Sequence, residues 1–404
     1  MKINRATAKQ VVFITYSFGF PNGMASTQRA RLLAKGLVEN GINATLLCVK
    51  ALERYPVENI EAKGVYQGVY FEYTPGVTIR PESFIKRRWL ELRGLVVAIK
   101  RLITLKNRDE IYCIYLYGNE KLNMTGCIYR LIATLLRIPL LLELNEMPWS
   151  LKSKPTYWEK KISPIAGATG TIVISDFLHH WVLAESGRKS KKISILYIPT
   201  MIDPSEEEKS GTQTSENVSR VLFAGSPIYS ETILFIIKAM DFVINEYPNC
   251  QLTITGCRET DPHGAWMQSE KIGLALQDNI IFAGYVPRDE LLTLYKSSKA
   301  LLIPLFDDLV SKARFPIKIG EYLLSSRPVV TTNVGEVTKY FKNNENAFIC
   351  EPGDPKAFAE LILAALKNPD RANEIGQMGR SVAMQNFNYS IWGKELAQFV
   401  KTIR

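Results

Sequence analysis

Residues 314–330 read Arg-Phe-Pro-Ile-Lys-Ile-Gly-Glu-Tyr-Leu-Leu-Ser-Ser-Arg-Pro-Val-Val, and this stretch decides the fold class. The apolar run 300–304 before it predicts a buried strand, and residues 328–332 predict another. A helix is predicted to begin between them at Pro316, because proline lacks the N–H that would be unpaired at a first helical position. A strand, a helix and a second strand in this order are typical of a parallel α/β sheet.

The start of this predicted helix is basic. Lys318 falls in the first turn, where the helix dipole favours negative charge, and Lys312 and Arg314 precede it. Cations at this end of a helix are typical of a phosphate or diphosphate site. Glu321 lies one turn further on the same face, where a carboxylate commonly accepts hydrogen bonds from ribose hydroxyls. The alternative is a Lys–Glu pair on a solvated helix, worth roughly 0.2–0.5 kcal/mol.

Strand and helix patterns alternate through the whole chain. Because one hydrophobic core rarely supports 404 residues, two domains are expected. The polar segment 204–218 lacks apolar periodicity and is predicted to be the linker. A helix is predicted at 26–40, ended by Gly41. The predicted strands are residues 11–15, 44–49, 111–116, 140–143 and 171–174 in the first half, and 221–224, 251–255, 279–282, 300–304 and 328–332 in the second. The fold class is therefore α/β with two doubly wound sheets.

The formal net charge of +10 predicts an anionic partner. The sequence contains no helix-turn-helix, zinc-finger or RNP-type motif, so nucleic acid is not expected as that partner. An anionic small substrate and an anionic membrane surface both stay open.

Three features predict a cytoplasmic protein. The first ten residues are polar and basic and lack the layout of a signal peptide. The longest apolar run, 131–144, is interrupted by Arg137 and Pro139 and is too short to span a bilayer. The six cysteines are dispersed, as expected of free thiols in a reducing compartment.

Neither a metal ion nor a bound cofactor is predicted. The chain has three histidines, His179, His180 and His263, and none of them clusters with carboxylates at ligand spacing. The loop 19–23, which follows the first predicted strand, contains two glycines but no G-x-G-x-x-G fingerprint. A dinucleotide cofactor is therefore disfavoured.

Four segments together resemble one enzyme family. The pattern Pro-x-Lys-x-x-Glu-Tyr-Leu at 316–323, followed by Arg-Pro-Val-Val, resembles the donor-site signature of family 4 of the retaining glycosyltransferases, the glycosyl transferases group 1. Residues 11–29, 193–203 and 221–226 are similar to further segments of that family, in the same order. The resemblance spans nearly the whole chain.

The resemblance implies the GT-B fold, in which two Rossmann-like domains face a central cleft. On this basis residues 1–207 form the acceptor-side domain and 218–387 the domain that binds a nucleotide sugar, the donor. Residues 388–404 are expected to pack back on the first domain.

The resemblance also implies where the substrates bind. On the donor side it implies contacts from Gly23, Met24, Gly225, Ser226, Lys312, Arg314, Pro316, Lys318, Glu321 and Tyr322. On the acceptor side it implies Asn145, Glu146 and Ser175, and it assigns catalysis to Lys318, Arg314 and Glu146. No metal takes part in this scheme, because basic side chains and helix dipoles stabilise the leaving diphosphate.

Several of these residues also have simpler interpretations. The loop at Gly23 can be a strand-to-helix turn that needs positive φ. Asn145 and Glu146 can begin a helix, and Ser175 can cap the helix that follows it.

Two departures from the family pattern bear on the donor site. Many members carry an acidic residue eight positions before the second glutamate, and here that position is Ala313. Many also have an Arg and a Lys after the glycine of the second-domain strand, whereas Gly225 is followed by no base until Lys238. Either Lys312, Arg314 and Lys318 replace this two-cation clamp, or the protein is catalytically weak.

Residues 83–106 form a basic amphipathic segment. Trp89, Leu92 and residues 95–97 are predicted to form an apolar face surrounded by Lys and Arg. Such a helix can lie on an anionic membrane. Alternatively, it is a surface helix that buries its apolar stripe in the core of the first domain.

The sequence therefore predicts a glycosyltransferase that moves a sugar from a nucleotide diphosphate sugar to a hydroxyl of a glycan or a lipid-linked acceptor. By resemblance, the anomeric configuration is retained and the pathway is surface polysaccharide synthesis. Two alternatives stay open: a nucleotide-sugar epimerase or phosphorylase on the same fold, and a non-catalytic glycan- or nucleotide-binding subunit.

Overall fold

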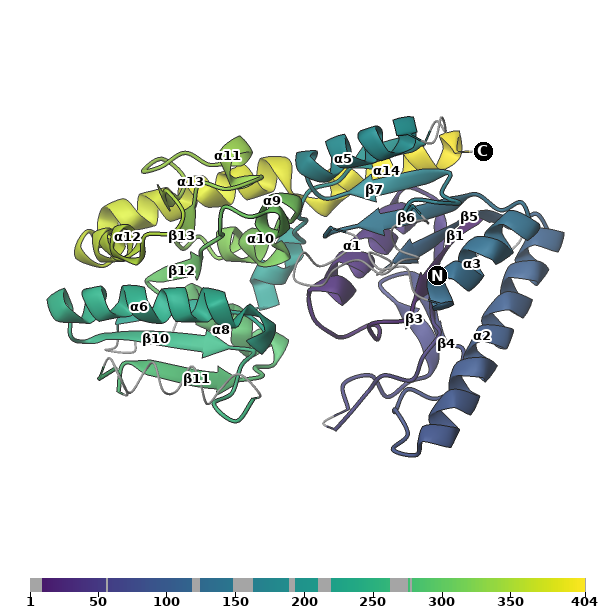
Figure 1. Ribbon diagram of the computed structural model, residues 1–404, viewed down its shortest axis with the longest axis horizontal. Coiled ribbons are helices and arrows are strands. Elements are labelled where there is room, and N and C mark those ends of the chain that lie inside the picture. Colours follow the sequence, from purple (N-terminus) through teal and green to yellow (C-terminus); the bar gives the residue numbers. More distant parts are fainter. Residues whose placement is uncertain are drawn as a thin grey trace. The chain divides into compact units, whose positions relative to one another are not determined.

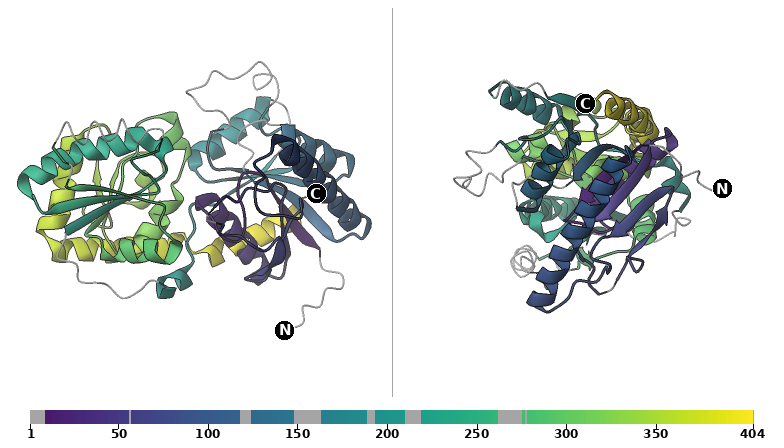
Figure 2. Two further views of the ribbon diagram at one scale, coloured as in Figure 1. Left: turned by 90° about the horizontal axis from the view of Figure 1, so that it is seen from below. Right: turned by 90° about the vertical axis from the view of Figure 1, so that its right-hand side faces the viewer.

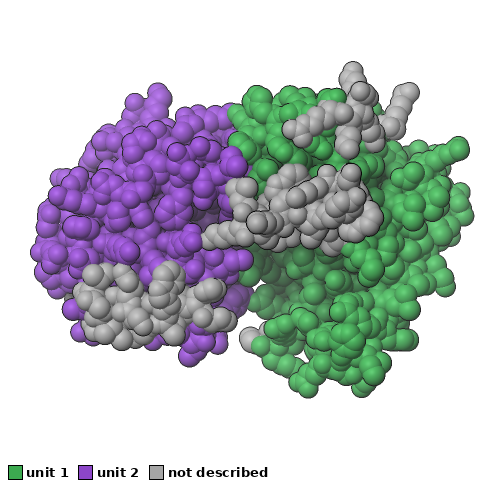
Figure 3. Space-filling view, viewed as in Figure 1, with its two compact units in different colours: residues 1–201, 389–404 green, residues 202–388 purple. Residues whose placement is uncertain are grey.

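The computed structural model describes residues 9–55, 57–117, 124–147, 163–188, 193–209, 219–261, 275–276 and 278–403. The chain divides into two compact units (Figure 3). The first comprises residues 1–201 and 389–404, and the second comprises 202–388. The bounds expected from the sequence were 1–207 with 388–404, and 218–387.

The first unit is built on an eight-stranded sheet (Figure 1). Its strand order is β3-β4-β2-β1-β5-β6-β7-β8. β3 is antiparallel to β4, and the other neighbouring pairs are parallel. The strands are β1 (Gln10–Thr15), β2 (Asn43–Cys48), β3 (Lys63–Tyr66), β4 (Val69–Tyr73), β5 (Ile111–Tyr117), β6 (Leu140–Leu144), β7 (Gly170–Val173) and β8 (Ser194–Tyr197).

Helices cover both faces of this sheet. Side chains of a strand point alternately to opposite faces, and in β1 both sets are buried. Val11 and Phe13 pack with α1 (Ala25–Glu39) and α14 (Tyr389–Thr402). Val12 and Ile14 pack with α2 (Phe84–Asn107) and α3 (Met124–Leu135). A further helix, α5 (Asp176–Arg188), contacts β7 and β8. The first unit is therefore a three-layer α/β sandwich.

The C-terminal helix α14 packs closely on α1. A Cβ atom on Gly36 would lie 2.6 Å from Cα of Gly393, so the two helix backbones meet at this pair of glycines. Tyr389 adds a hydrogen bond of 2.8 Å to the Glu39 carboxylate, and its ring lies below the Lys35 ammonium at 4.3 Å. These contacts join the last residues of the chain to the first unit.

The second unit contains a six-stranded, all-parallel sheet in the order β11-β10-β9-β12-β13-β14. The left view of Figure 2 shows its strands between two layers of helices. The strands are β9 (Ser219–Ala224), β10 (Cys250–Thr255), β11 (Ile280–Gly284), β12 (Ala300–Ile303), β13 (Val329–Thr332) and β14 (Phe348–Cys350). The helices are α6 (Ser230–Glu246), α8 (Arg288–Ser297), α9 (Leu309–Ala313), α10 (Ile317–Leu324), α11 (Val337–Tyr340), α12 (Pro355–Lys367) and α13 (Pro369–Asn386).

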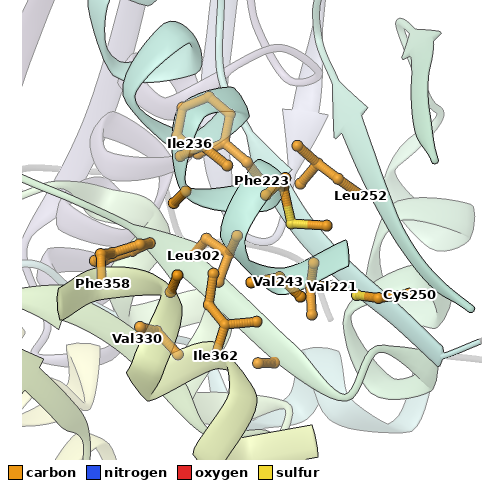
Figure 4. Close-up of a cluster of buried hydrophobic side chains, with 14 of the residues drawn as sticks. Val221, Phe223, Ile236, Val243, Cys250, Leu252, Leu302, Val330, Phe358 and Ile362 are labelled. Atoms are coloured by element: carbon orange, nitrogen blue, oxygen red, sulfur yellow. The ribbon is translucent and has the colours of Figure 1, made fainter. Parts of the chain in front are cut away.

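One face of this sheet packs against α6 and α12 in an apolar core (Figure 4). Val221, Leu252 and Leu302 of adjacent strands meet Ile236 of α6 and Ile362 of α12, and each of these side chains is fully buried. Strands buried on both faces are expected of a parallel sheet, and their near-continuous apolar sequences follow from this burial.

One sequence-based prediction needs correction. The helix predicted to start at Pro316 begins one residue later at Ile317, with Pro316 as its N-cap. The segment 204–218, predicted to be the linker, starts with the 3₁₀ helix η1 (Pro204–Lys209). Its Glu206 is buried against Arg288 of α8, and this ion pair orders a segment that has no apolar pattern.

Residues 83–106 coincide with the long helix α2 (Figure 1). It buries a narrow stripe of Gly94, Ala98 and Leu102, while Trp89 and Leu92 of the predicted apolar face are about 60% exposed. No helix in the described ranges is both long and apolar enough to cross a membrane.

Candidate functional site

The donor-side residues of the second unit gather at the carboxyl edge of its sheet. β9 pairs with β10 on one side and with β12 on the other. The strand order therefore reverses its direction between β9 and β12, which makes this position the switch point of the sheet. Ligands of open α/β sheets bind at such a switch point, beyond the carboxyl ends of the strands. Gly225 and Ser226 follow β9, and the Arg314 guanidinium lies 5.3 Å from the Tyr229 ring of the same loop. The structure thus brings Arg314 to the loop that contains Gly225 and Ser226.

The N-terminus of α10 is not capped by a side chain. Its N-cap, Pro316, has no side-chain acceptor, and no acidic residue lies in the first turn. The Ile319 N–H donates to the Pro316 carbonyl at 3.0 Å, so it is chiefly the positive end of the helix dipole that attracts anions to this end of α10. Tyr322 fixes the position of this helix, because its buried hydroxyl accepts a hydrogen bond of 2.8 Å from the Ala224 N–H at the end of β9.

Lys318 is half-buried in the first turn of α10. Desolvation of its ammonium group lowers the pKa of Lys318 below the ordinary lysine value. The Glu321 carboxylate acts against this shift, and the Arg288 guanidinium adds to it. A partly desolvated cation at this position favours an incoming anion, which would restore part of the lost solvation.

Glu321 is held in place by a residue that the sequence reasoning missed. Its carboxylate accepts a hydrogen bond of 2.7 Å from Nη1 of Arg288 and lies 3.4 Å from the Tyr295 hydroxyl. Nη2 of Arg288 donates to Glu206 at 2.6 Å. Desolvation acts to lower the pKa of Arg288, but the two carboxylates outweigh it and raise the pKa. The predicted ribose ligand is therefore oriented by a partly buried ion-pair network.

Lys312 lies near this site but has a partner of its own. It lies in the last turn of the short helix α9 and forms an ion pair of 2.5 Å with Asp307. Gly335 allows the chain after β13 to approach, since a Cβ there would lie 3.3 Å from Cα of Lys312. Ala313, at the position where many relatives have an acid, is fully buried.

The predicted glycine loop of the first unit connects β1 to α1. Gly23 has a φ of 153°, and a Cβ there would collide with the Thr27 hydroxyl, so no other residue fits without strain. Asn59 binds the loop from outside, accepting from the Asn22 N–H at 2.8 Å. Met24, the N-cap of α1, makes no side-chain capping bond and is 61% exposed. A second uncapped helix N-terminus therefore lies at this loop.

The acceptor-side residues follow neighbouring strands of the first sheet. Asn145 and Glu146 follow β6, and Ser175 follows β7. Asn145 donates to the Tyr117 hydroxyl at 3.0 Å, while Glu146 is exposed. Ser175 is buried and accepts a bond of 3.2 Å from the Leu178 N–H. Ser175 thus caps α5, the simpler interpretation of this residue. A helix that begins at Asn145 and Glu146 would extend past residue 147, outside the described residues.

Within the described ranges, no group of three or more His, Cys, Asp or Glu side chains has a geometry that would hold a metal ion.

Comparisons with known proteins agree with this geometry. Residues 204–382 match the family model described as Glycosyl transferases group 1. The match lies within the second unit of the chain. The second unit, which contains α10 and the ends of β9 and β12, is therefore similar to the domain that this family shares.

The most informative curated relative is the capsular polysaccharide biosynthesis glycosyltransferase CapM of Staphylococcus aureus. The two sequences are 24% identical over 245 residues, which are 58% of this chain and 62% of CapM. The chain thus matches less than two thirds of the length of this relative.

Two solved structures share the whole fold. Sucrose-phosphate synthase from Thermosynechococcus elongatus has a TM-score of 0.70 at 16% identity, with 97% of this chain and 98% of that chain covered. Anabaena Alr3699/HepE, solved in complex with UDP-glucose, has a TM-score of 0.70 at 15% identity, with 97% and 99% covered. The chain therefore has the GT-B fold predicted from its sequence.

Proposed function

We propose that this glycosyltransferase transfers a hexose from a UDP-sugar to a hydroxyl group of a glycan or lipid-linked acceptor in surface polysaccharide synthesis. The observation that carries the proposal is the uncapped N-terminus of α10, where Lys318 and Arg314 lie at the switch point of the second sheet. The UDP-glucose complex of Alr3699/HepE supports the donor class, and the name of CapM supports the pathway.

Each donor-side residue has a distinct role in this proposal. Lys318 and Arg314 bind the diphosphate and neutralise the charge that develops on it as the sugar leaves. The positive end of the α10 dipole adds to this stabilisation. Glu321, oriented by Arg288, accepts hydrogen bonds from the ribose hydroxyls. The loop at Gly23 and Met24 supplies further N–H groups.

On the acceptor side we assign Glu146 and Asn145 to the reacting sugars. Glu146 is exposed at the carboxyl end of β6, where its carboxylate would orient an acceptor hydroxyl or bind hydroxyls of the transferred sugar. Ser175 has a structural role as the cap of α5, and its position at the end of β7 places the start of this helix.

A donor screen followed by product analysis tests the proposal. UDP-glucose and UDP should raise the melting temperature of the protein, because a ligand that binds the native state stabilises it. Incubation with UDP-glucose and short glycans should then release UDP and extend the acceptor with the donor's anomeric configuration. A non-catalytic binding subunit would show the thermal shift but no product with any donor and acceptor. An epimerase would convert the donor without an acceptor.

Catalysis should not require a divalent metal. In this scheme Lys318, Arg314 and the α10 N-terminus neutralise the leaving diphosphate, which is the task that Mg²⁺ performs in metal-dependent transferases. The initial rate in excess EDTA should therefore equal the rate in Mg²⁺. Loss of activity in EDTA that added Mg²⁺ or Mn²⁺ restores would contradict this mechanism.

A further inference from the structure

A cavity whose lining residues take no part in the proposed function lies at the carboxyl edge of the sheet in the first unit. Its volume is about 130 Å³, well above the ~10–15 Å³ that one water molecule needs on the same measure. Three of the residues that line it come from loops. Tyr16 follows β1, Lys50 lies in the loop after β2, and Arg80 precedes α2. Arg87 and Glu91 lie on the first two turns of α2. The cavity is therefore large enough for a polyatomic group.

The wall of this cavity is strongly basic. It carries three cations, Lys50, Arg80 and Arg87, and one carboxylate, Glu91. Glu91 is already paired at 2.6 Å with Arg88, which does not line the cavity. Within the part of the chain that the structure describes, the side chains of Lys50 and Arg80 have no hydrogen-bond or ion-pair partner. Repulsion among these three cations lowers the stability of the folded protein. A bound anion would offset this repulsion.

The backbone holds these cations in position. The Glu53 N–H donates to the Thr78 carbonyl at 3.0 Å, and the Arg80 N–H donates to the Glu53 carbonyl at 3.0 Å. The segment with Arg80 is thereby tied to the segment that follows Lys50. Gly94 lets α2 approach as well, because a Cβ there would lie 2.5 Å from the Val49 carbonyl oxygen. The backbone positions of Lys50 and Arg80 are therefore fixed relative to one another, which lowers the cost of ordering these side chains around an anion.

We propose that this cavity binds a phosphate or diphosphate group carried by the acceptor substrate, which rests on the proposed function. Two guanidinium groups and an ammonium match the charge and the several oxygens of a phosphate, since arginine binds such groups in a bidentate manner. The donor diphosphate has its own site in the second unit, so this cavity serves a different anion. The transferase therefore recognises its acceptor by a phosphate as well as by sugar hydroxyls.

Two sources can supply such a phosphate: a soluble sugar phosphate or a lipid. The helix α2 exposes Phe84, Ile85 and Trp89 beside Arg87, by 59%, 79% and 59% of their surface. Apolar side chains next to a basic site are suited to the interface of a membrane. The lipid source would use these side chains, whereas the soluble source would use the cavity alone.

The first arm of the test uses pyrophosphate as the probe. Calorimetric titration is done in saturating UDP, so that the donor site is occupied. Pyrophosphate should bind the parent and bind Lys50→Gln/Arg80→Gln ~10-fold or more weakly, as expected for loss of charge-assisted contacts. The control Lys63→Gln/Lys100→Gln removes the same charge from exposed residues of the same unit that do not line the cavity, and it should bind like the parent.

The second arm uses phosphatidylcholine vesicles with and without phosphatidic acid. A lipid source predicts sedimentation only with phosphatidic acid, reduced in Lys50→Gln/Arg80→Gln and in Arg87→Gln more than in the control. A soluble source predicts that only the pyrophosphate titration separates the variants. If the cavity variants and the control behave alike in both arms, the proposal is wrong. UDP binding, measured separately on each protein, reports on the proposed function, because no cavity variant alters the second unit.

Discussion

Replacing Arg29 by Met is expected to lower the free energy of unfolding by about 3–5 kcal/mol, the usual cost of breaking a buried ion pair from one side. Arg29 on α1 and Glu143 on β6 are 1% and 0% exposed and are joined at 2.7 Å. The Arg29 guanidinium also donates to the carbonyls of Ile198 and Pro199, at 2.8 and 2.5 Å. The substitution would leave the Glu143 carboxylate buried with Tyr115 as its remaining partner.

The electrostatics support this expectation. Desolvation acts to lower the pKa of Arg29, but Glu143, Tyr117 and Tyr115 together raise it above the ordinary value. The native state thus holds Arg29 firmly as a cation. Because α1 carries the loop of Gly23 and Met24 at its N-terminus, loss of this ion pair should also loosen that loop.

Urea denaturation measures this effect directly. Arg101→Met is the control, because Arg101 is 51% exposed and pairs with Glu72 at 3.0 Å. Exposed pairs are worth about 0–1 kcal/mol, so this variant should unfold close to the parent. The double variant Arg29→Met/Glu143→Leu should recover much of the loss, since no buried charge is left alone. Equal midpoints for Arg29→Met and Arg101→Met would contradict the argument.

The fold could be predicted from sequence because its signals are local. The run Val-Leu-Phe-Ala at 221–224 is apolar on both faces, and this pattern alone marks a strand buried on both faces of a parallel sheet. The helix at 26–40 was confirmed as α1, with Asn40 as its C-cap and Gly41 at a φ of 76°. The antiparallel β3–β4 hairpin was missed, because β3 at the sheet edge has no fully buried residue and so lacks a strong apolar pattern.

The candidate site could be predicted only in part, because some of its contacts join residues that are far apart in the sequence. Lys318 and Glu321 are three residues apart, and helical spacing alone predicts that they share a face. Arg288 joins Glu321 across 33 residues and Glu206 across 82, and no sequence spacing indicates such a contact. Its only local signal is a cation at the first position of α8, where the helix dipole disfavours it, as at Lys318. This signal does not single out Arg288, because Lys356 also lies in the first turn of a helix of the second unit.

The clearest test of the donor site is Lys318→Met. UDP should bind this variant ~10–100-fold more weakly, because a charge-assisted contact to phosphate is lost. The free protein should not be destabilised. Folding lowers the pKa of Lys318, so the unfolded chain binds this proton more tightly, and the charged side chain costs stability in the folded state. That cost is fully present below the lowered pKa and vanishes above the unfolded value of about 10.4.

Lys356 provides a matched control. It occupies the same position as Lys318, the second residue of a helix in the second unit, but it is exposed. The N-terminus of its helix is capped by Asp354, whose carboxylate accepts from the N–H groups of Lys356 and Ala357 at 2.9 and 3.2 Å. Lys356→Met should therefore bind UDP like the parent.

Calorimetry with UDP and thermal melts without it, both between neutral and alkaline pH, separate the two effects. The affinity of the parent for UDP should fall as pH rises through the lowered pKa of Lys318, because a neutral amine no longer attracts the diphosphate. The affinity of Lys318→Met should show no such fall. In the melts, any stability advantage of Lys318→Met over the parent should shrink as pH rises, since the parent loses its buried charge. If Lys318→Met and Lys356→Met bind UDP equally well, the donor diphosphate does not bind at the start of α10.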